Sequence, residues 1–128
     1  MYPIWLHLRI FASPRRDFAS LNMRIIAKET LERYGRKHAL AWQPLRAWHD
    51  LVKQETWNTP EDIKRSFPSV SFVGGDRLVF NIKGNAYRLV ARVRYKKPST
   101  KQGVVDVIRV MTHAEYDKVD VTTLRYEG

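Results

Sequence analysis

Residues 78–95 read LVFNIKGNAYRLVARVRY, and apolar and polar side chains alternate on both sides of their Lys-Gly-Asn-Ala turn. Such alternation indicates two antiparallel strands joined as a hairpin. The apolar set is Leu78, Phe80, Ile82, Leu89 and Val93, and the polar set is Asn81, Lys83, Arg88, Arg92 and Arg94. Because alternate positions of a strand face opposite ways, we expect other elements to cover one face of the sheet and the basic face to be open to solvent.

The flanking sequence predicts the remaining elements. Apolar side chains recur at helical spacing before the hairpin, and Thr59 followed by Pro60 is typical of a capped helix start. We expect helices over 28–38, 43–56 and 60–66, and further strands over 23–27, 70–72 and 104–113. Helices that come first and a meander that follows predict an α+β fold of two layers, with N-terminal helices packed on an antiparallel β-sheet.

The charge of the chain is strongly basic and unevenly placed. Its 128 residues carry a formal net charge of +10, and residues 77–109 hold nine basic side chains and one acidic side chain. Positive charge concentrated in one stretch favours binding to a polyanion such as a nucleic acid. No apolar run approaches the roughly 20 residues that cross a bilayer, and the apolar start of the chain lacks the features of a signal peptide. We therefore expect a soluble, cytoplasmic protein without membrane contact.

Several classes of chemistry have no support in the sequence. The chain has no cysteine, which excludes a disulfide, a thiolate metal site and a cysteine nucleophile. The four histidines are not spaced as metal ligands, and neither a Gly-rich phosphate loop nor a nucleophile elbow is present. We expect no metal ion and no other cofactor.

Two groups of polar residues are candidates for chemistry. Across the hairpin, Asn81, Lys83 and Arg88 come near one another, and cations gathered on one strand face would be stabilised by a bound anion. Alternatively, these residues form a solvated face that keeps the sheet soluble. At the end of the last strand, residues 112–118 read THAEYDK and contain two groups that transfer protons, His113 and Tyr116. Histidine is the usual general acid or base near neutral pH, although an isolated histidine is also common as a plain surface residue.

Five motifs, in this order along the chain, resemble HigB-type toxins of bacterial toxin–antitoxin modules. They are MRIIAK (23–28), WNTPEDIK (57–64), FVG (72–74), FNIKGNAYRLV (80–90) and MTHAEYDK (111–118). HigB-type toxins belong to the RelE-like group, whose small α+β fold resembles microbial ribonucleases. The resemblance implies an mRNA interferase that cleaves messenger RNA on the translating ribosome, by metal-independent attack of the 2′-hydroxyl. It also implies a HigA-like helix-turn-helix antitoxin as partner, with operator DNA bound only through that antitoxin.

The resemblance assigns roles to particular residues. Arg88 matches the arginine that the family carries on its sheet and would stabilise the phosphate, while His113 matches the histidine of the Thr-His motif and would act as general acid or base. Tyr116 would orient or replace His113, and Lys83 is a further catalytic candidate at a position where the family varies. The residues expected to bind RNA are Asn81, Arg92, Arg94, Lys96, Lys97 and Arg109.

Three features depart from the family. Arg109 stands four residues before His113, where family members often have an arginine five residues before the histidine. In a regular strand this slip reverses the face, so Arg109 is either served by a β-bulge or not catalytic. The loop 96–103 is longer and more basic than usual and is a candidate for contacts with ribosomal RNA. Residues 1–22 have no counterpart, so we divide the chain into this extension, derived from an upstream start codon or helping to hold the antitoxin, and a single toxin domain at 23–128.

Two other functions fit the same residues. A non-catalytic RNA- or DNA-binding module needs the basic face but not His113. A degenerate toxin would act only as an interaction partner in its operon. Substitution of His113 separates these functions, because only a catalytic toxin depends on a proton-transfer group there.

Overall fold

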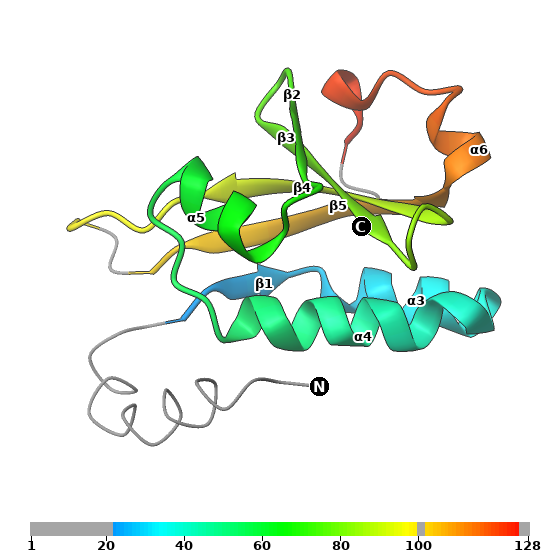
Figure 1. Cartoon of the computed structure of the whole chain (residues 1–128), viewed down its shortest axis with the longest axis horizontal. Coiled ribbons are helices and arrows are strands. Elements are labelled where there is room, and N and C mark those ends of the chain that lie inside the picture. The colour runs from blue at the N-terminus through cyan, green and yellow to red at the C-terminus, as the bar shows by residue number, and fades with distance from the viewer. Residues whose placement is uncertain (1–21, 100–101, 126–128) are drawn as a thin grey trace.

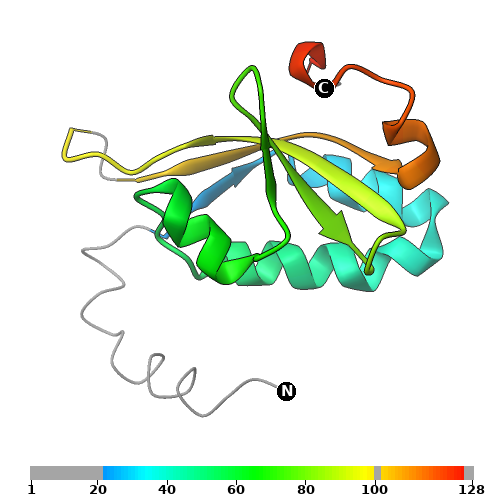
Figure 2. The same cartoon turned by 45° about the horizontal axis from the view of Figure 1, so that its top comes forward.

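The computed structural model describes residues 22–99 and 102–125, which form an α+β fold. The predicted extension, apart from Asn22, lies outside these residues. The helices are α3 (Lys28–Lys37), α4 (Ala39–Lys53), α5 (Pro60–Ser66) and α6 (His113–Tyr116), with a 3-10 turn η1 (Val121–Thr123). The strands are β1 (Arg24–Ile26), β2 (Ser71–Val73), β3 (Arg77–Ile82), β4 (Tyr87–Arg94) and β5 (Val104–Thr112). Helices α3 and α4 lie along one face of the sheet in both views (Figures 1 and 2), which confirms the predicted two-layer arrangement.

The sheet has five strands in the order β1-β5-β4-β3-β2. Strands β2 to β5 form the predicted antiparallel meander. Strand β1 instead runs parallel to β5, pairing Arg24–Ile26 with Val104–Asp106, so the expectation of a wholly antiparallel sheet is wrong at this edge. Parallel pairing needs a long connection between the two strands, and the helices and the meander together supply it.

Helix α4 begins four residues earlier and ends three residues earlier than the predicted range 43–56. Pro44 lies inside the helix, where it lacks the amide hydrogen that would bond the carbonyl of the preceding turn. The helix nevertheless extends back to Ala39, because Ala41 in the turn before the proline is fully buried against the core. Burial of the apolar face therefore outweighs the loss of one backbone hydrogen bond.

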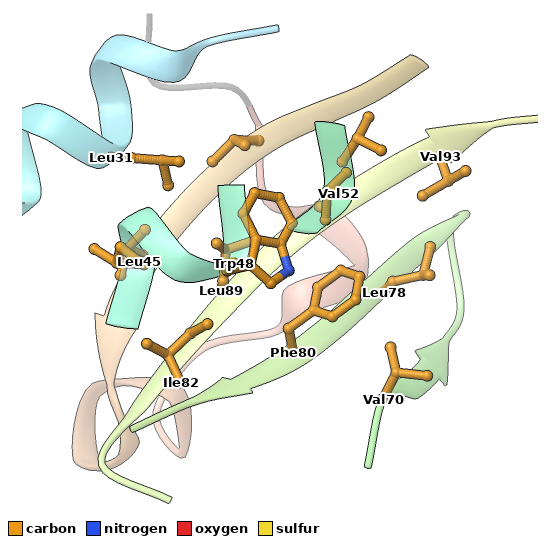
Figure 3. Close-up of a cluster of buried hydrophobic side chains, with 14 of the residues drawn as sticks. Leu31, Leu45, Trp48, Val52, Val70, Leu78, Phe80, Ile82, Leu89 and Val93 are labelled. Atoms are coloured by element: carbon orange, nitrogen blue, oxygen red, sulfur yellow. The ribbon is translucent and has the colours of Figure 1, made fainter. Parts of the chain in front are cut away.

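The main core lies between α4 and the strands of the hairpin. The ring of Trp48 packs edge-on against the ring of Phe80 on β3, with centroids 5.3 Å apart. Figure 3 shows the indole nitrogen of Trp48 on the side that faces Phe80. The core side chains labelled there from the helices and strands include Leu31, Leu45, Val52, Leu78, Ile82, Leu89 and Val93. All five apolar hairpin positions thus point at the helices, as the alternation predicts.

Helix α5 begins as the sequence predicts. The Thr59 hydroxyl accepts a hydrogen bond from the Asp62 amide at 3.3 Å, and the Asp62 carboxylate accepts from the amides of Asn58 and Thr59. These hydrogen bonds, the one from Asn58 first, lower the pKa of Asp62. Reciprocal capping fixes the start of α5 and with it the chain that leads on to Phe67.

The sheet face away from α3 and α4, here called the outer face, is not open along its whole length. Val79, Val90, Ile108, Met111 and Val121 form a second apolar cluster there, with residues of the C-terminal segment packed against it. The expectation of an open face is therefore wrong over this part. The physical reason is that two outward positions of the hairpin carry valine, and buried apolar surface requires a cover.

A β-bulge interrupts β5 on this face. Val90 pairs with Arg109, but the next residue, Ala91, pairs with Val107, which leaves Ile108 as the extra residue. Cross-strand partners lie on the same face, so Arg109 shares the outer face with Val90. The bulge precedes Arg109, and residues 109–112 pair regularly with β4, so Arg109 reaches the outer face by ordinary alternation and not through a bulge between it and His113.

No helix within the described ranges combines the length and apolar character needed to span a membrane.

Candidate active site

Arg88 is the most enclosed polar residue of the candidate site. It lies on the outer face of β4 with only 8% of its surface exposed, so the expectation that it points into solvent is wrong. One terminal nitrogen, Nη2, donates to the Asn85 side-chain oxygen and to His113 Nδ1, each at 2.7 Å. The other, Nη1, donates to the backbone oxygens of Asn85 at 3.1 Å and Tyr87 at 3.3 Å. Four acceptors therefore hold the guanidinium in one orientation.

The turn between β3 and β4 supplies two of these four acceptors, both on Asn85, and Tyr87 at the start of β4 supplies a third. Lys83 and Gly84 both take positive φ, at 55° and 62°, which turns the chain sharply and brings Asn85 back over Arg88. Glycine adopts this conformation without steric cost, whereas lysine does so only where the surroundings impose it. The turn is thus built around the arginine that follows it.

His113 is fixed where β5 passes into α6. Its backbone amide donates to the Ala86 oxygen at 3.0 Å, which ties it to the β3–β4 turn. The Thr112 hydroxyl accepts from the Glu115 amide at 3.1 Å, and the Glu115 carboxylate accepts from the Thr112 amide at 2.8 Å. This reciprocal cap starts α6 at His113, although the helix has only four residues.

The hydrogen bond with Arg88 determines the proton position on the His113 ring. Arginine is always protonated and only donates, so Nδ1 must accept and the ring proton of a neutral imidazole lies on Nε2. Nε2 is 3.4 Å from the Asp117 carboxylate, one helical turn further along the chain. The side chains of His113 and Asp117 are 48% and 59% exposed. The ring is therefore oriented from both sides while its edge remains accessible to a ligand.

Tyr116 completes the group. The Arg88 guanidinium carbon lies 5.6 Å from the centroid of the Tyr116 ring, a cation–π contact. Tyr116 also packs against the second apolar cluster, and this contact fixes the position of its ring. The structure thus brings the rings of His113 and Tyr116 into contact with the Arg88 guanidinium.

The other predicted catalytic residue, Lys83, is exposed in the turn. Within the described ranges, no hydrogen bond or ion pair joins it to Arg88 or His113. Asn81, predicted to bind RNA, lies directly opposite Arg88 in the β3–β4 ladder. Asn81 and Lys83 line a hollow beside α4, which lies away from the groups that contact the Arg88 guanidinium.

The remaining predicted RNA-binding residues lie on the far side of the second apolar cluster or within it. Arg92 is exposed and pairs in register with Arg77 and Asp106, while Arg94 forms an ion pair with Asp106 at 3.2 Å. Lys96 is half-buried, Lys97 is exposed, and Arg109 is half-buried beside the bulge. Residues 100 and 101 of the predicted basic loop lie outside the described residues. The structure therefore separates these cations from His113.

Sequence reasoning missed two residues of the site, Asn85 and Asp117. Both left a signal in the sequence. Asn85 follows a glycine in the turn three residues before Arg88, where asparagine often bonds neighbouring groups. Asp117 stands four residues after His113, the spacing at which side chains meet on one helix face.

A half-buried tyrosine lies on the helix side of the same end of the sheet. Tyr34 stacks on His38 with ring centroids 4.1 Å apart and meets Tyr87 edge-on. Burial raises the pKa of Tyr34 to about 12, and the charge of Glu115 adds to the effect. Tyr34 therefore stays neutral at physiological pH and packs as an aromatic ring. Within the described part of the chain, no group of three or more histidine, aspartate and glutamate side chains is gathered as metal ligands.

Helices packed on one face of a five-stranded mixed sheet form an α+β arrangement that fits the class of RelE-like toxin domains. The family model of HigB toxins, described as the RelE-like toxic component of a toxin-antitoxin system, matches residues 41–119. The chain belongs to this family. A toxin of such a system has an antitoxin as its partner.

Similar proteins carry names that state an activity. The mRNA interferase HigB of Escherichia coli O6:H1 is 27% identical over 99 residues, which cover 76% of this chain and 91% of that protein. The mRNA interferase toxin HigB of Escherichia coli K12 is 31% identical over 97 residues, covering 74% of this chain and 88% of that protein. The mRNA interferase HigB of Shigella flexneri has the same identity and coverage.

Proposed function

We propose that this toxin is an endoribonuclease that cleaves messenger RNA on the translating ribosome without a metal ion. The observation that carries the proposal is the 2.7 Å hydrogen bond between Arg88 and His113, which sets a phosphate-binding cation beside a proton-transfer group. The names of the similar proteins support messenger RNA as the substrate. The basic stretch 77–109 supports an RNA ligand on electrostatic grounds.

The proposed reaction is an intramolecular transfer at phosphorus. The 2′-hydroxyl oxygen of one nucleotide attacks the adjacent phosphorus and loses its proton to a base. Negative charge grows on the phosphoryl oxygens, and the bond to the 5′-oxygen of the next nucleotide breaks as that oxygen takes up a proton. The products are a 2′,3′-cyclic phosphate and a free 5′-hydroxyl, with no water consumed.

Each residue of the candidate site has its own role in the proposed reaction. Arg88 sets its positive charge beside the phosphoryl oxygens, and its enclosed position strengthens the attraction to the developing charge. His113 exchanges a proton with a reacting oxygen as general acid or base. Tyr116 orients His113 or takes its place, since its ring already lies over the guanidinium. Lys83 supplies further positive charge near the entering strand.

The proposed partners follow from the same assignment. We place the messenger RNA on the ribosome, with Asn81, Arg92, Arg94, Lys96, Lys97 and Arg109 as its contacts. The antitoxin would be a HigA-like helix-turn-helix protein that alone contacts operator DNA. In bacteria this places the toxin in the cytoplasm, where ribosomes translate.

Induction of the full chain in bacteria tests this function. Growth and messenger RNA ends are mapped for the wild type, Arg88→Ala and His113→Ala. His49→Ala and Arg46→Ala are matched controls on α4, remote from the site. We expect growth arrest with new ends inside translated messages in the wild type and both controls, and neither in the two site variants. Circular dichroism of each purified variant separates loss of activity from loss of fold.

Other results identify the competing functions. Arrest without new RNA ends would indicate a binding module that blocks translation without cleavage. Absence of arrest in the wild type would indicate a degenerate toxin that serves only as an interaction partner. Equal toxicity of His113→Ala would move the proton-transfer role to Tyr116 or remove it.

A further inference from the structure

The hydrogen bonds of Arg88 leave its guanidinium little capacity to bind a ligand directly. Its two terminal nitrogens, Nη1 and Nη2, carry four N–H groups, and four acceptors take all of them. Because a guanidinium has five N–H groups, only the one on Nε is uncommitted. The usual two-point contact between arginine and a phosphate is therefore unavailable in this geometry. Neighbouring groups must supply the hydrogen bonds to a phosphate at this site.

The four acceptors around Arg88 are all electrically neutral. Two are backbone oxygens, one is a side-chain amide oxygen and one is an imidazole nitrogen. Within the described ranges, no carboxylate forms an ion pair with Arg88. Glu115 and Asp117, the acids at α6, contact the Thr112 amide and His113 Nε2 instead. An enclosed cation without a counter-ion costs folding free energy, which a bound anion would recover.

The orientation of the Asn85 amide follows from its contact with Arg88. Arginine only donates, so the Asn85 atom that lies 2.7 Å from Nη2 must be the oxygen Oδ1. The nitrogen Nδ2, on the other branch of the same planar group, then faces away from the guanidinium. Asn85 is exposed, and no acceptor in the described part of the chain lies within hydrogen-bond distance of Nδ2. Two N–H groups are thus held beside the cation and open to a ligand.

Asn85 and His113 contact the same guanidinium nitrogen. Oδ1 of Asn85 and Nδ1 of His113 each lie 2.7 Å from Nη2, so their separation is at most twice that distance. The backbone fixes both residues: positive φ at Lys83 and Gly84 places Asn85, and the His113 amide donates to the Ala86 oxygen. Both side chains belong to exposed residues. A phosphate against Nδ2 would therefore lie beside the imidazole ring.

We propose that Asn85 is a further catalytic residue, whose Nδ2 donates a hydrogen bond to a phosphoryl oxygen of the phosphate that is cut. Its Oδ1 holds Arg88 in place without neutralising the positive charge. Arg88 thus supplies the electric field and Asn85 supplies the donor as negative charge grows on that oxygen. Aspartate in place of Asn85 would hold the arginine more tightly, but it would cancel the charge and lack the donor. The inference rests on the proposed endoribonuclease function and adds to it the group that donates to the phosphate.

The test compares Asn85→Asp and Asn85→Ala in the full chain. Cleavage rates of messenger RNA in a translation extract are measured together with urea unfolding midpoints. Asn58→Asp and Asn58→Ala are matched controls, because Asn58 is exposed before α5 and bonds Asp62 through its backbone amide. We expect Asn85→Asp to keep or raise the urea midpoint and yet to slow cleavage by about 10²-fold or more, the size expected for loss of one donor to a developing anion. Asn85→Ala should lower both, and the controls should cut at the wild-type rate.

The aspartate variant separates a catalytic role from a purely structural one. A residue that only positions Arg88 needs an acceptor oxygen, which aspartate retains, so its replacement would leave cleavage near the wild-type rate. That result, in a protein whose wild type cuts RNA, overturns the proposal and leaves the endoribonuclease function standing. Opposite changes of stability and activity in Asn85→Asp support the proposal, because loss of fold would lower both.

A binding measurement with inorganic phosphate is independent of RNA cleavage. Nitrogen-15 NMR follows the side-chain NH₂ signals of Asn85, which are assigned by their absence in Asn85→Ala. At constant ionic strength, phosphate should shift these signals saturably, leave those of Asn58 unchanged and have no effect in Arg88→Ala. Signals of Asn85 that do not move in the wild type overturn the proposal, even where Asn85→Asp fails to fold. A saturable shift in a wild type that does not cut RNA refutes the endoribonuclease function and retains Asn85 as a phosphate-binding residue.

Discussion

The outer face of the sheet has two ends that use arginine differently. At the histidine end, defined by Arg88, His113 and Tyr116, the guanidinium is enclosed and donates to four acceptors. At the loop end, defined by Arg92, Arg94, Lys96 and Lys97, the Arg94 side chain is 56% exposed and forms an ion pair with Asp106. The second apolar cluster lies between the two ends.

The difference arises from what meets each end of β4. Strand β4 carries three arginines at outward positions, Arg88, Arg92 and Arg94. Strand geometry alone would therefore predict the same exposure for all three. At the start of β4 the turn residue Asn85 and helix α6 close over Arg88. At its other end the strand continues into a basic loop. A preorganised, desolvated cation suits the stabilisation of a transition state, whereas an exposed cation suits steering and non-specific attachment.

Replacement of His113 is expected to have the largest effect on this contrast. His113→Ala should lower the rate of RNA cleavage by about 10²- to 10⁴-fold, the usual contribution of a general acid or base. The variant should fold normally because the side chain is about half exposed. Cleavage rates at saturating RNA in a translation extract measure the effect, with His49→Ala as control. Equal rates for His113→Ala and wild type would remove the catalytic distinction between the two ends.

Replacement of Arg88 should follow, and it alone should also affect stability. Arg88→Ala removes the cation from the reacting phosphate, and we expect cleavage to fall by about 10²- to 10³-fold. It also leaves the acceptors on Asn85, Tyr87 and His113 without their donor, which should lower the free energy of unfolding by about 1–3 kcal/mol.

Urea unfolding with cleavage assays measures both effects of the arginine. Arg88→Lys keeps the charge without the planar fork and should recover stability more than activity. Arg92→Ala is the matched variant at the loop end and should leave the free energy of unfolding nearly unchanged. Equal destabilisation by Arg88→Ala and Arg92→Ala would contradict the contrast in burial.

Sequence patterns predicted those features of the fold that depend on residues close together in the chain. Alternation over most of the hairpin predicted β3 and β4 and the side chains that face the helices. Capping residues located α5, where Thr59 and Asp62 act locally. These features depend on neighbours in the chain, and pattern rules describe them well.

The features that could not be predicted depend on distant segments. The parallel edge strand β1 pairs with β5 across the whole length of the intervening helices and meander, Arg24 with Val104. The bulge at Ile108 interrupts the alternation of β5, and the C-terminal segment covers Val79 and Val90 from a distance along the chain. The burial of Arg88 results from a turn and a helix that meet over it. Strand periodicity therefore predicts that the arginines of β4 lie on the outer face, but it does not predict that one is buried and the others are exposed.

The loop end should affect RNA affinity and not the chemical step. Arg92→Ala should weaken RNA binding and lower the slope of log affinity against log salt by about 0.7, the value for one phosphate contact to a single strand. Titrations over a range of salt concentrations measure this slope. Asp106→Asn is the complementary variant, because it releases Arg94 from its ion pair and should strengthen RNA binding. A salt slope that is the same in Arg92→Ala and wild type would exclude a phosphate contact at this end.

The smallest expected effect concerns Asp117 at the histidine end. Its carboxylate lies 3.4 Å from His113 Nε2, and both side chains are half exposed, so water competes for the contact. Because exposed ion pairs contribute about 0.2–1 kcal/mol, Asp117→Ala should slow cleavage by up to about fivefold. Asp117→Asn, which keeps an acceptor oxygen, should slow cleavage less.

Nitrogen NMR of the His113 imidazole provides a readout that a merely structural role would not change, and we expect the ring proton on Nε2 in the wild type. A wild-type proton on Nδ1 would mean that Arg88 does not donate to the ring, and the histidine end would then lose the orientation that distinguishes it from the loop end.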